Sequence, residues 1–215
     1  MEYKLIRSKR KTLVIKIIDN CQIIVLAPNK CSLKNINDFV VANQNWIAKK
    51  IQQKQAENQL LAKYYNFDNI LLFGESLDVV DKTNHYQIGE HYVKHSKSSN
   101  KQKVIKEFLK KQANVYIISR AKQIAQNFGF EYKDIQITSA KRSWGSCNSL
   151  KCLKFNYKTI MLPKQLIDYV ICHELCHLKE MNHGVKFWKM LGDMGYKKTE
   201  VNKAFKPYNF VLQLF

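Results

Sequence analysis

The first thirty residues carry the apolar pattern of β-strands. Segments 3–7, 12–18 and 21–27 are rich in β-branched side chains, and Asn20 and Pro28 stand at their ends as turn residues. This pattern predicts a small group of strands at the start of the chain.

A helical pattern follows these strands. Ser32 is a residue type favoured at helix N-caps, and apolar residues then recur at a spacing of three or four positions. These apolar positions are Ile36, Phe39, Val40, Ile47 and Ile51. We expect one helix from Leu33 to about Tyr64.

Residues 66–95 return to short, strand-like segments. Turns at Gly74-Glu75-Ser76 and Gly89-Glu90 each have apolar residues on both sides, which is typical of β-hairpins. The polar stretch 96–103 that comes next is short of apolar anchors. It predicts a boundary between an N-terminal lobe, residues 1–98, and a second domain, residues 99–215.

The second half of the chain combines helices with two strands. The expected elements are a helix at 102–128, strands at 135–139 and 152–162, a helix at 164–179, and shorter helices near 184–194 and 198–205. The predicted fold class is α+β, with an N-terminal β-rich lobe, a helical middle and a distinct C-terminal domain.

The composition indicates a globular chain with a strongly basic surface. Hydrophobic residues make up 46% of the 215 residues, and the net charge is +19. Residues 1–100 contribute +6 of this charge and residues 101–215 contribute +13. Such a surface attracts nucleic acid, nucleotides or anionic membranes. A lysine-rich solvated face explains the charge equally well, because aromatic residues do not alternate with the basic runs in a nucleic-acid-binding pattern.

The sequence shows neither a targeting segment nor a membrane span. Residues 1–11 lack the apolar run of a signal peptide, and no apolar stretch approaches the ~20 residues that cross a bilayer. The six cysteines include no CxxC pair, so free thiols are expected. We therefore expect a cytoplasmic protein.

An HExxH motif at residues 173–177 carries the clearest chemistry. His173 and His177 are four positions apart, so on a helix both imidazoles face the same side and can bind one metal ion. Neutral imidazole is a good zinc ligand. Glu174 lies beside this face, where it can take a proton from a water that the metal activates.

A third histidine extends the ligand set. His183 follows His173 by ten positions and gives the pattern HExxH-x5-H. Asn182 tolerates a left-handed backbone and Gly184 frees the turn, so both suit a chain reversal that returns His183 to the helix. Three protein ligands leave one coordination position open, which is typical of catalytic zinc. The expected cofactor is one Zn²⁺ per chain.

The helix expected after His183 is amphipathic. Phe187 and Trp188 lie at helical spacing with Val185 and Leu191. We expect them to pack this helix onto the core and not to bind substrate.

Two stretches together resemble a known family. HELCHLKEMNHGVKFW at 173–188 and RSWGSC at 142–147 are similar to the YgjP-like metal-dependent hydrolases, which are related to the SprT-like and Wss-type minimal zincins. The resemblance covers the chain in outline and is sharpest over 135–190. It implies a C-terminal minimal zincin, a metallopeptidase-like domain.

The same resemblance implies roles for individual residues. His173, His177 and His183 would be the metal ligands, and Glu174 would be the base. Glu180 stands where the metzincins, which share this ligand spacing, have glycine, so the turn must be made differently.

The RSWGSC segment has a functional and a structural interpretation. Arg142 suits an anionic substrate group or a developing oxyanion, Trp144 suits a pocket wall, and Gly145 allows close approach of the backbone. The alternative is a structural β-turn with Trp144 in the core.

The strand after this segment also has two interpretations. Residues 153–157 are a candidate edge strand beside the metal, where an extended peptide would pair by β-augmentation. Tyr157 at its end is a candidate oxyanion donor, or an ordinary tyrosine of the sheet.

Three functions remain open at the level of sequence. The first is a zinc-dependent, metallopeptidase-like hydrolase acting on peptides or proteins. The second, also implied by the family resemblance, is a nucleoside triphosphate (UTP) pyrophosphatase, although no phosphate-binding GxxxxGK[ST] loop and no acidic cluster for Mg²⁺ occur. The third is a nucleic-acid-associated zincin or docking protein, whose only support is the positive charge.

Overall fold

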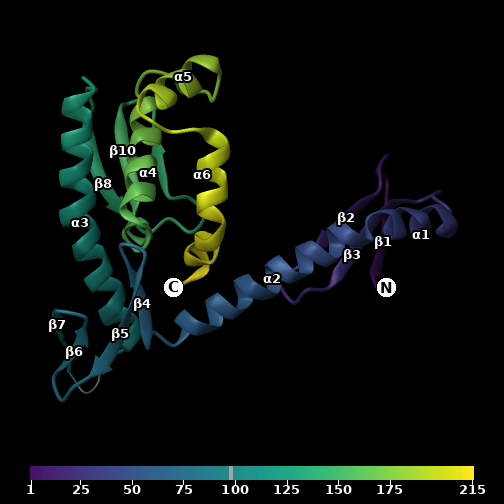
Figure 1. Ribbon diagram of the computed structural model, residues 1–215, viewed down its shortest axis with the longest axis horizontal. Coiled ribbons are helices and arrows are strands. Elements are labelled where there is room, and N and C mark those ends of the chain that lie inside the picture. Colours follow the sequence, from purple (N-terminus) through teal and green to yellow (C-terminus); the bar gives the residue numbers. More distant parts are fainter. Residues whose placement is uncertain (97–98) are drawn as a thin grey trace. The chain divides into compact units, whose positions relative to one another are not determined.

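The computed structural model describes residues 1–96 and 99–215, which form two compact units, Met1–Ala62 and Lys63–Phe215 (Figure 1). The division falls earlier than the expected boundary after residue 98. Residues 97 and 98, beside that expected boundary, lie outside the described residues. The hairpins at 66–95 belong to the second unit because their sheet packs against elements further along the chain.

The first unit is a three-stranded sheet covered by helices. Strands β1 (Lys4–Ser8), β2 (Val14–Ile17) and β3 (Ile23–Pro28) pair in the order β1-β3-β2, with β3 parallel to β1 and antiparallel to β2. Alternate residues of β3 point into the core. There they join apolar residues of the following helices, and the buried cluster is Ile23, Val25, Ala27, Ile36, Val40 and Ile47.

The single helix expected over 33–64 is two helices. Helix α1 spans Leu33–Ala42 and α2 spans Gln44–Tyr65. Asn43 interrupts them because its backbone leaves the helical conformation and its side-chain amide donates to the Phe39 carbonyl at 2.8 Å. Asparagine competes with the helix for backbone hydrogen bonds in this way.

The second unit begins with a four-stranded antiparallel meander, which confirms the two expected hairpins. Strands β4 (Asn69–Leu72), β5 (Glu75–Asp81), β6 (His85–Ile88) and β7 (His91–Lys94) pair in chain order. The β4–β5 turn touches the helical part of the unit. A Cβ on Gly74, whose φ is +83°, would lie 2.7 Å from Pro163 Cγ, so only glycine fits there.

A long helix and a small sheet form the middle of the second unit. Helix α3 spans Lys101–Asn127, close to the expected bounds. Strands β8 (Asp134–Thr138), β9 (Gly145–Cys147) and β10 (Cys152–Asn156) pair in the order β8-β10-β9. The strand expected over 152–162 ends at Asn156, because that side chain caps the 3₁₀ turn η1 (Tyr157–Met161) by accepting from the Lys158 amide.

Helix α4 (Lys164–Cys176) carries the HExxH motif and lies between the β8-β10-β9 sheet and helix α6 (Figure 1). It ends three residues before the expected position. Arg120 of α3 holds it with two parallel hydrogen bonds to Asp168, at 2.8 and 2.7 Å. Helices α5 (Val185–Asp193) and α6 (Lys198–Phe205) and the 3₁₀ segment η2 (Lys206–Gln213) complete the chain.

The α+β class is confirmed, with strands and helices segregated along the chain. Within residues 1–96 and 99–215, none of the helices combines the length and apolarity needed to cross a membrane. All six cysteines are free thiols, as expected.

Candidate metal centre

Three histidines meet at the end of helix α4. His173 lies in its last turn, His177 is the first residue after it, and His183 returns from the following loop. One nitrogen from each ring lies within 4.8 Å of the others, and Nε2 of His183 is 3.0 Å from Nε2 of His173. Tetrahedral zinc with bonds of about 2.0–2.1 Å needs nitrogens roughly 3.3 Å apart. The donor set therefore fits a zinc ion after small movements.

The other ring nitrogens of two of these histidines have partners that orient them. Nδ1 of His177 lies 3.0 Å from the Glu180 carbonyl oxygen. A carbonyl only accepts, so this Nδ1 carries the proton and Nε2 keeps its lone pair for a metal. Nδ1 of His173 lies 3.3 Å from the Tyr169 hydroxyl, one helical turn away on the same face. The sequence analysis did not select Tyr169, although its i−4 position was available.

An aromatic floor supports the three rings. Phe187 is fully buried, and its ring centroid lies 4.6–5.0 Å from the centroids of all three imidazoles. The Trp188 indole N–H donates to the His183 carbonyl at 3.0 Å. Both residues thus pack α5 onto the protein as expected, and in addition they fix the loop that carries the third ligand.

Two of the three histidines, His173 and His183, are held in the neutral form. Burial, together with the neighbouring His177 and His183, lowers the pKa of His173 to about 4. Burial and the neighbouring charges of His177 and Lys198 also lower the pKa of His183. Neutral imidazole is the form that binds metals, so the site is ready for a cation at neutral pH.

Glu174 is a buried carboxyl beside this cluster. Its side chain is almost fully buried, and burial raises the pKa of Glu174 to about 8. Within the described part of the chain no side chain donates a hydrogen bond to it, so its proton-accepting capacity is not used by the protein. A nearby cation would favour the ionised form.

Gly145 of strand β9 makes room for this carboxyl. A Cβ built on Gly145 would lie 2.7 Å from Glu174 Cγ and 2.9 Å from Oε1. Real Cβ atoms do not approach so closely, so any other residue at position 145 would push Glu174 away. The close approach expected for Gly145 is present, and its partner is the candidate base.

Strand β9 is the free edge of its sheet, whereas the sequence analysis expected the edge at 153–157. Residues 152–156 form β10, which is central because β8 occupies its other side. The backbone N–H of Asn156 donates to the Trp144 carbonyl, and the backbone N–H of Asn148 donates to the Cys152 carbonyl. Since antiparallel bonding alternates, the backbone groups of Gly145 and Cys147 point away from β10.

The loop before β9 is tied to β10 by polar side chains. Asn156 donates to the carbonyls of Ala140 and Ser143, at 2.7 and 2.9 Å, and the Thr159 hydroxyl donates to the Trp144 carbonyl at 3.0 Å. These bonds hold the loop so that Trp144 lines a cavity beside His173.

Two other sequence candidates do not join the site. Arg142 is exposed, makes no ion pair within the described residues and is not among the cavity-lining residues. Tyr157 is 1% exposed, and its ring packs edge-on against Phe215. Its hydroxyl is buried without a hydrogen-bond partner, so the structure gives Tyr157 no contact with a substrate at the histidines.

The turn to His183 uses a different geometry from the one expected. Gly184 has φ −77°, and Asn182 is not among the residues with positive φ. Neither position therefore needs a left-handed backbone. The reversal is made by the amide of Glu180, which bonds back to the Cys176 carbonyl at 2.9 Å, and by a Gly184–Asn182 bond at 2.8 Å.

A cavity of about 580 Å³ opens beside His173 and Glu174. Helix α6 and η2 supply much of its wall, which the sequence analysis did not foresee. The apolar lining is Trp144, Tyr169, Val170, Val201 and Phe205, and the polar lining beyond the ligands is Ser143, Asn202, Lys206 and Asn209.

Comparison with known proteins assigns this arrangement to a family. The profile described as YgjP-like, metallopeptidase domain, matches residues 11–205. The chain belongs to the YgjP-like metallopeptidase family. Family membership makes it a metal-dependent hydrolase and implies a divalent metal, for which the three histidines are a compatible site.

Solved structures of two metallopeptidase zymogens are also similar to this chain. Jannalysin of Methanocaldococcus jannaschii is 28% identical, with 41% of this chain and 88% of that chain covered and a TM-score of 0.37. Abylysin of Pyrococcus abyssi is 17% identical, with 46% and 96% covered and a TM-score of 0.40. No curated protein matches the chain.

Proposed function

We propose that the protein is a zinc-dependent peptidase in which His173, His177 and His183 hold one Zn²⁺ and Glu174 is the general base. The observation that carries the proposal is the contact of Glu174 with Gly145. This contact supports the proposal because a buried carboxyl, to which no side chain in the described part of the chain donates a hydrogen bond, lies against a free strand edge and directly follows His173. A peptide lying along that edge would present its carbonyl to both the carboxyl and the proposed metal site.

Each part of the site has its own role in the proposed reaction. A bound zinc supplies Lewis acidity for a water and for a substrate carbonyl. Glu174 accepts the proton of the attacking water and passes it to the leaving amine. Gly145 and Cys147 offer outward backbone groups that align an extended substrate antiparallel or parallel to β9. The aromatic wall of Trp144 and Phe205 receives an apolar side chain next to the scissile bond.

The nucleotide alternative has less support. A triphosphate needs several cationic or metal-binding groups around its oxygens. Lys206 is the one basic side chain among the cavity-lining residues, and Arg142 is outside them. The proposed proximity to nucleic acid still rests on net charge alone.

A substrate panel on zinc-loaded protein tests the function. The panel contains unstructured peptides with Leu, Phe, Ala or Glu near the middle, together with nucleoside triphosphates. We expect chelator-sensitive cleavage of the Leu and Phe peptides and none of the nucleotides. Phosphate or pyrophosphate release with intact peptides would replace the peptidase by the pyrophosphatase.

A further inference from the structure

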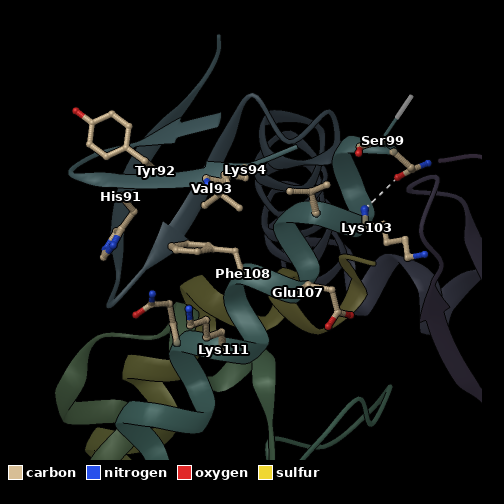
Figure 2. Close-up of a pocket in the computed structure, with 12 residues that line it drawn as sticks. His91, Tyr92, Val93, Lys94, Ser99, Lys103, Glu107, Phe108 and Lys111 are labelled. Carbon is tan, nitrogen blue, oxygen red and sulfur yellow. Dashed lines mark hydrogen bonds between the residues drawn. The ribbon is translucent and has the colours of Figure 1, made fainter. Parts of the chain in front are cut away.

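A second cavity, of about 830 Å³, lies between strand β7 and the first half of helix α3, and it shares no lining residue with the cavity at the histidines. Figure 2 shows the side chains of His91 and Phe108 between strand and helix, with Lys103, Glu107 and Lys111 along the helix. The proposed peptidase reaction does not use this groove.

The strand side of the groove is a free sheet edge among the described strands. Strand β7 is the last of the β4-β5-β6-β7 sheet. The His95 amide bonds to the Asn84 carbonyl at 3.0 Å, and the alternation of antiparallel bonds then turns the backbone groups of Tyr92 and Lys94 away from β6. Two residues of β7 can therefore accept another strand.

The floor of the groove is apolar. The His91 and Phe108 rings pack with centroids 5.3 Å apart, and Val93 and Val104 line the groove beside them. The strand side chains alternate, with His91 and Val93 half-buried and Tyr92 and Lys94 exposed. An added strand would place every second side chain over this floor.

The rim of the groove is basic. Lys94, Lys103 and Lys111 line it and are exposed. The one acidic lining residue, Glu107, is paired with Lys110 at 2.8 Å. The groove thus presents uncompensated positive charge next to unpaired backbone donors and acceptors.

We propose that this groove is a docking site for an extended, acidic peptide segment that adds to β7 as a fifth strand. Backbone hydrogen bonds to Tyr92 and Lys94 would hold the segment. Its side chains on the α3 face would cover Phe108 and bring carboxylates to Lys103 and Lys111, and carboxylates on its other face would lie beside Lys94. A nucleic acid fits less well, because it cannot continue a β-ladder.

A labelled ten-residue peptide in which pairs of Glu alternate with pairs of Val or Leu, so that each face of the strand carries both carboxylates and apolar groups, tests the groove by fluorescence anisotropy. We expect Lys103→Glu/Lys111→Glu to weaken its binding at least tenfold. The control Lys122→Glu/Lys133→Glu changes the net charge equally at exposed positions outside the groove, and it should alter binding less than twofold. Equal losses in both double variants would mean binding by net charge alone and would overturn the proposal.

Strand addition has its own readouts. Methylation of alternate backbone amides in the probe should abolish binding, since the methyl groups block the ladder. Bound probe should slow hydrogen exchange at the Tyr92 and Lys94 amides and leave exchange at Gly145 and Cys147 unchanged. Full binding of the methylated probe would refute the proposal. So would a ten-nucleotide single strand that binds more tightly with the same lysine dependence.

Discussion

Two free strand edges, β9 and β7, present outward backbone groups in the same way but differ in the groups that lie beside them. Each offers the outward groups of two residues, Gly145 and Cys147 in β9 and Tyr92 and Lys94 in β7. Beside β9 lie a buried carboxyl and three histidines, whereas beside β7 lie a phenylalanine and exposed lysines. The edge supplies only the means of binding an extended chain. We propose that the groups on the neighbouring helix determine whether that chain is positioned for cleavage, at β9, or is only bound, at β7.

The largest effect is expected from removing the proposed metal site, which distinguishes β9 from β7. His173→Ala/His177→Ala removes two of three ligands, so we expect no bound metal by elemental analysis and no hydrolysis. His85→Ala, a histidine outside the ligand set, should retain one equivalent of zinc. One equivalent of metal in the double variant would disprove the ligand assignment.

Glu174→Gln should leave the zinc site beside β9 intact and remove only the proposed general base. The amide keeps the shape of the side chain but cannot accept the proton, so we expect a loss of about 10²–10⁴-fold in kcat with full zinc content and an unchanged melting temperature. Glu180→Gln is the matched control, because only its backbone carbonyl contacts His177. Normal turnover in Glu174→Gln would remove this carboxyl from the mechanism.

Gly145→Ala tests whether catalysis requires the close contact between strand β9 and the Glu174 side chain. The added methyl group has to displace Glu174. A displacement of this kind costs roughly 10- to 100-fold in kcat, while metal content stays constant. Gly192→Ala, where no atom lies within 4 Å of the new methyl group, should have no effect on kcat. Equal activity in both variants would show that the contact does not position the base.

Phe205→Ala tests whether the aromatic wall of the cavity beside β9 selects the substrate side chain. Loss of this wall should reduce the preference for Leu or Phe over Ala beside the scissile bond by about 1–3 kcal/mol in kcat/KM, with cleavage of the Ala peptide nearly constant. Tyr208→Ala is the control, since this half-buried neighbour does not line the cavity. A uniform loss for all peptides would assign Phe205 to packing.

The smallest effect is expected at Arg142. Because this residue is exposed and outside the cavity lining, Arg142→Lys should change peptide kcat/KM less than twofold. If the substrate were a triphosphate held by a bidentate guanidinium, the same change would cost about 1.5–3 kcal/mol of binding. The ratio of nucleotide to peptide affinity in the variant and the parent distinguishes the two.

Local sequence determined most of the elements and the candidate metal ligands. The i,i+4 spacing of His173 and His177 depends only on helix geometry, and the turn residues around Gly89 fix a hairpin within a few positions. These features are encoded in short stretches, so the sequence analysis could predict them. The apolar pattern did not predict where two elements end. At Asn43 and at Asn156, a single side-chain amide ended an element that the apolar pattern alone would have continued.

Only the tertiary structure decided which strand is the edge, which residues wall the cavity and which candidates reach the site. Strand β10 is central because β8, whose residues lie 18 positions earlier, pairs with it, and no local pattern records that pairing. The Phe205 ring packs against Trp144, and the Phe215 ring packs against the buried Tyr157, although each pair is far apart in the sequence. Contacts between distant segments depend on the packing of the whole unit, so the sequence identified the candidate catalytic groups, whereas only the fold determined which residues line the cavity beside them.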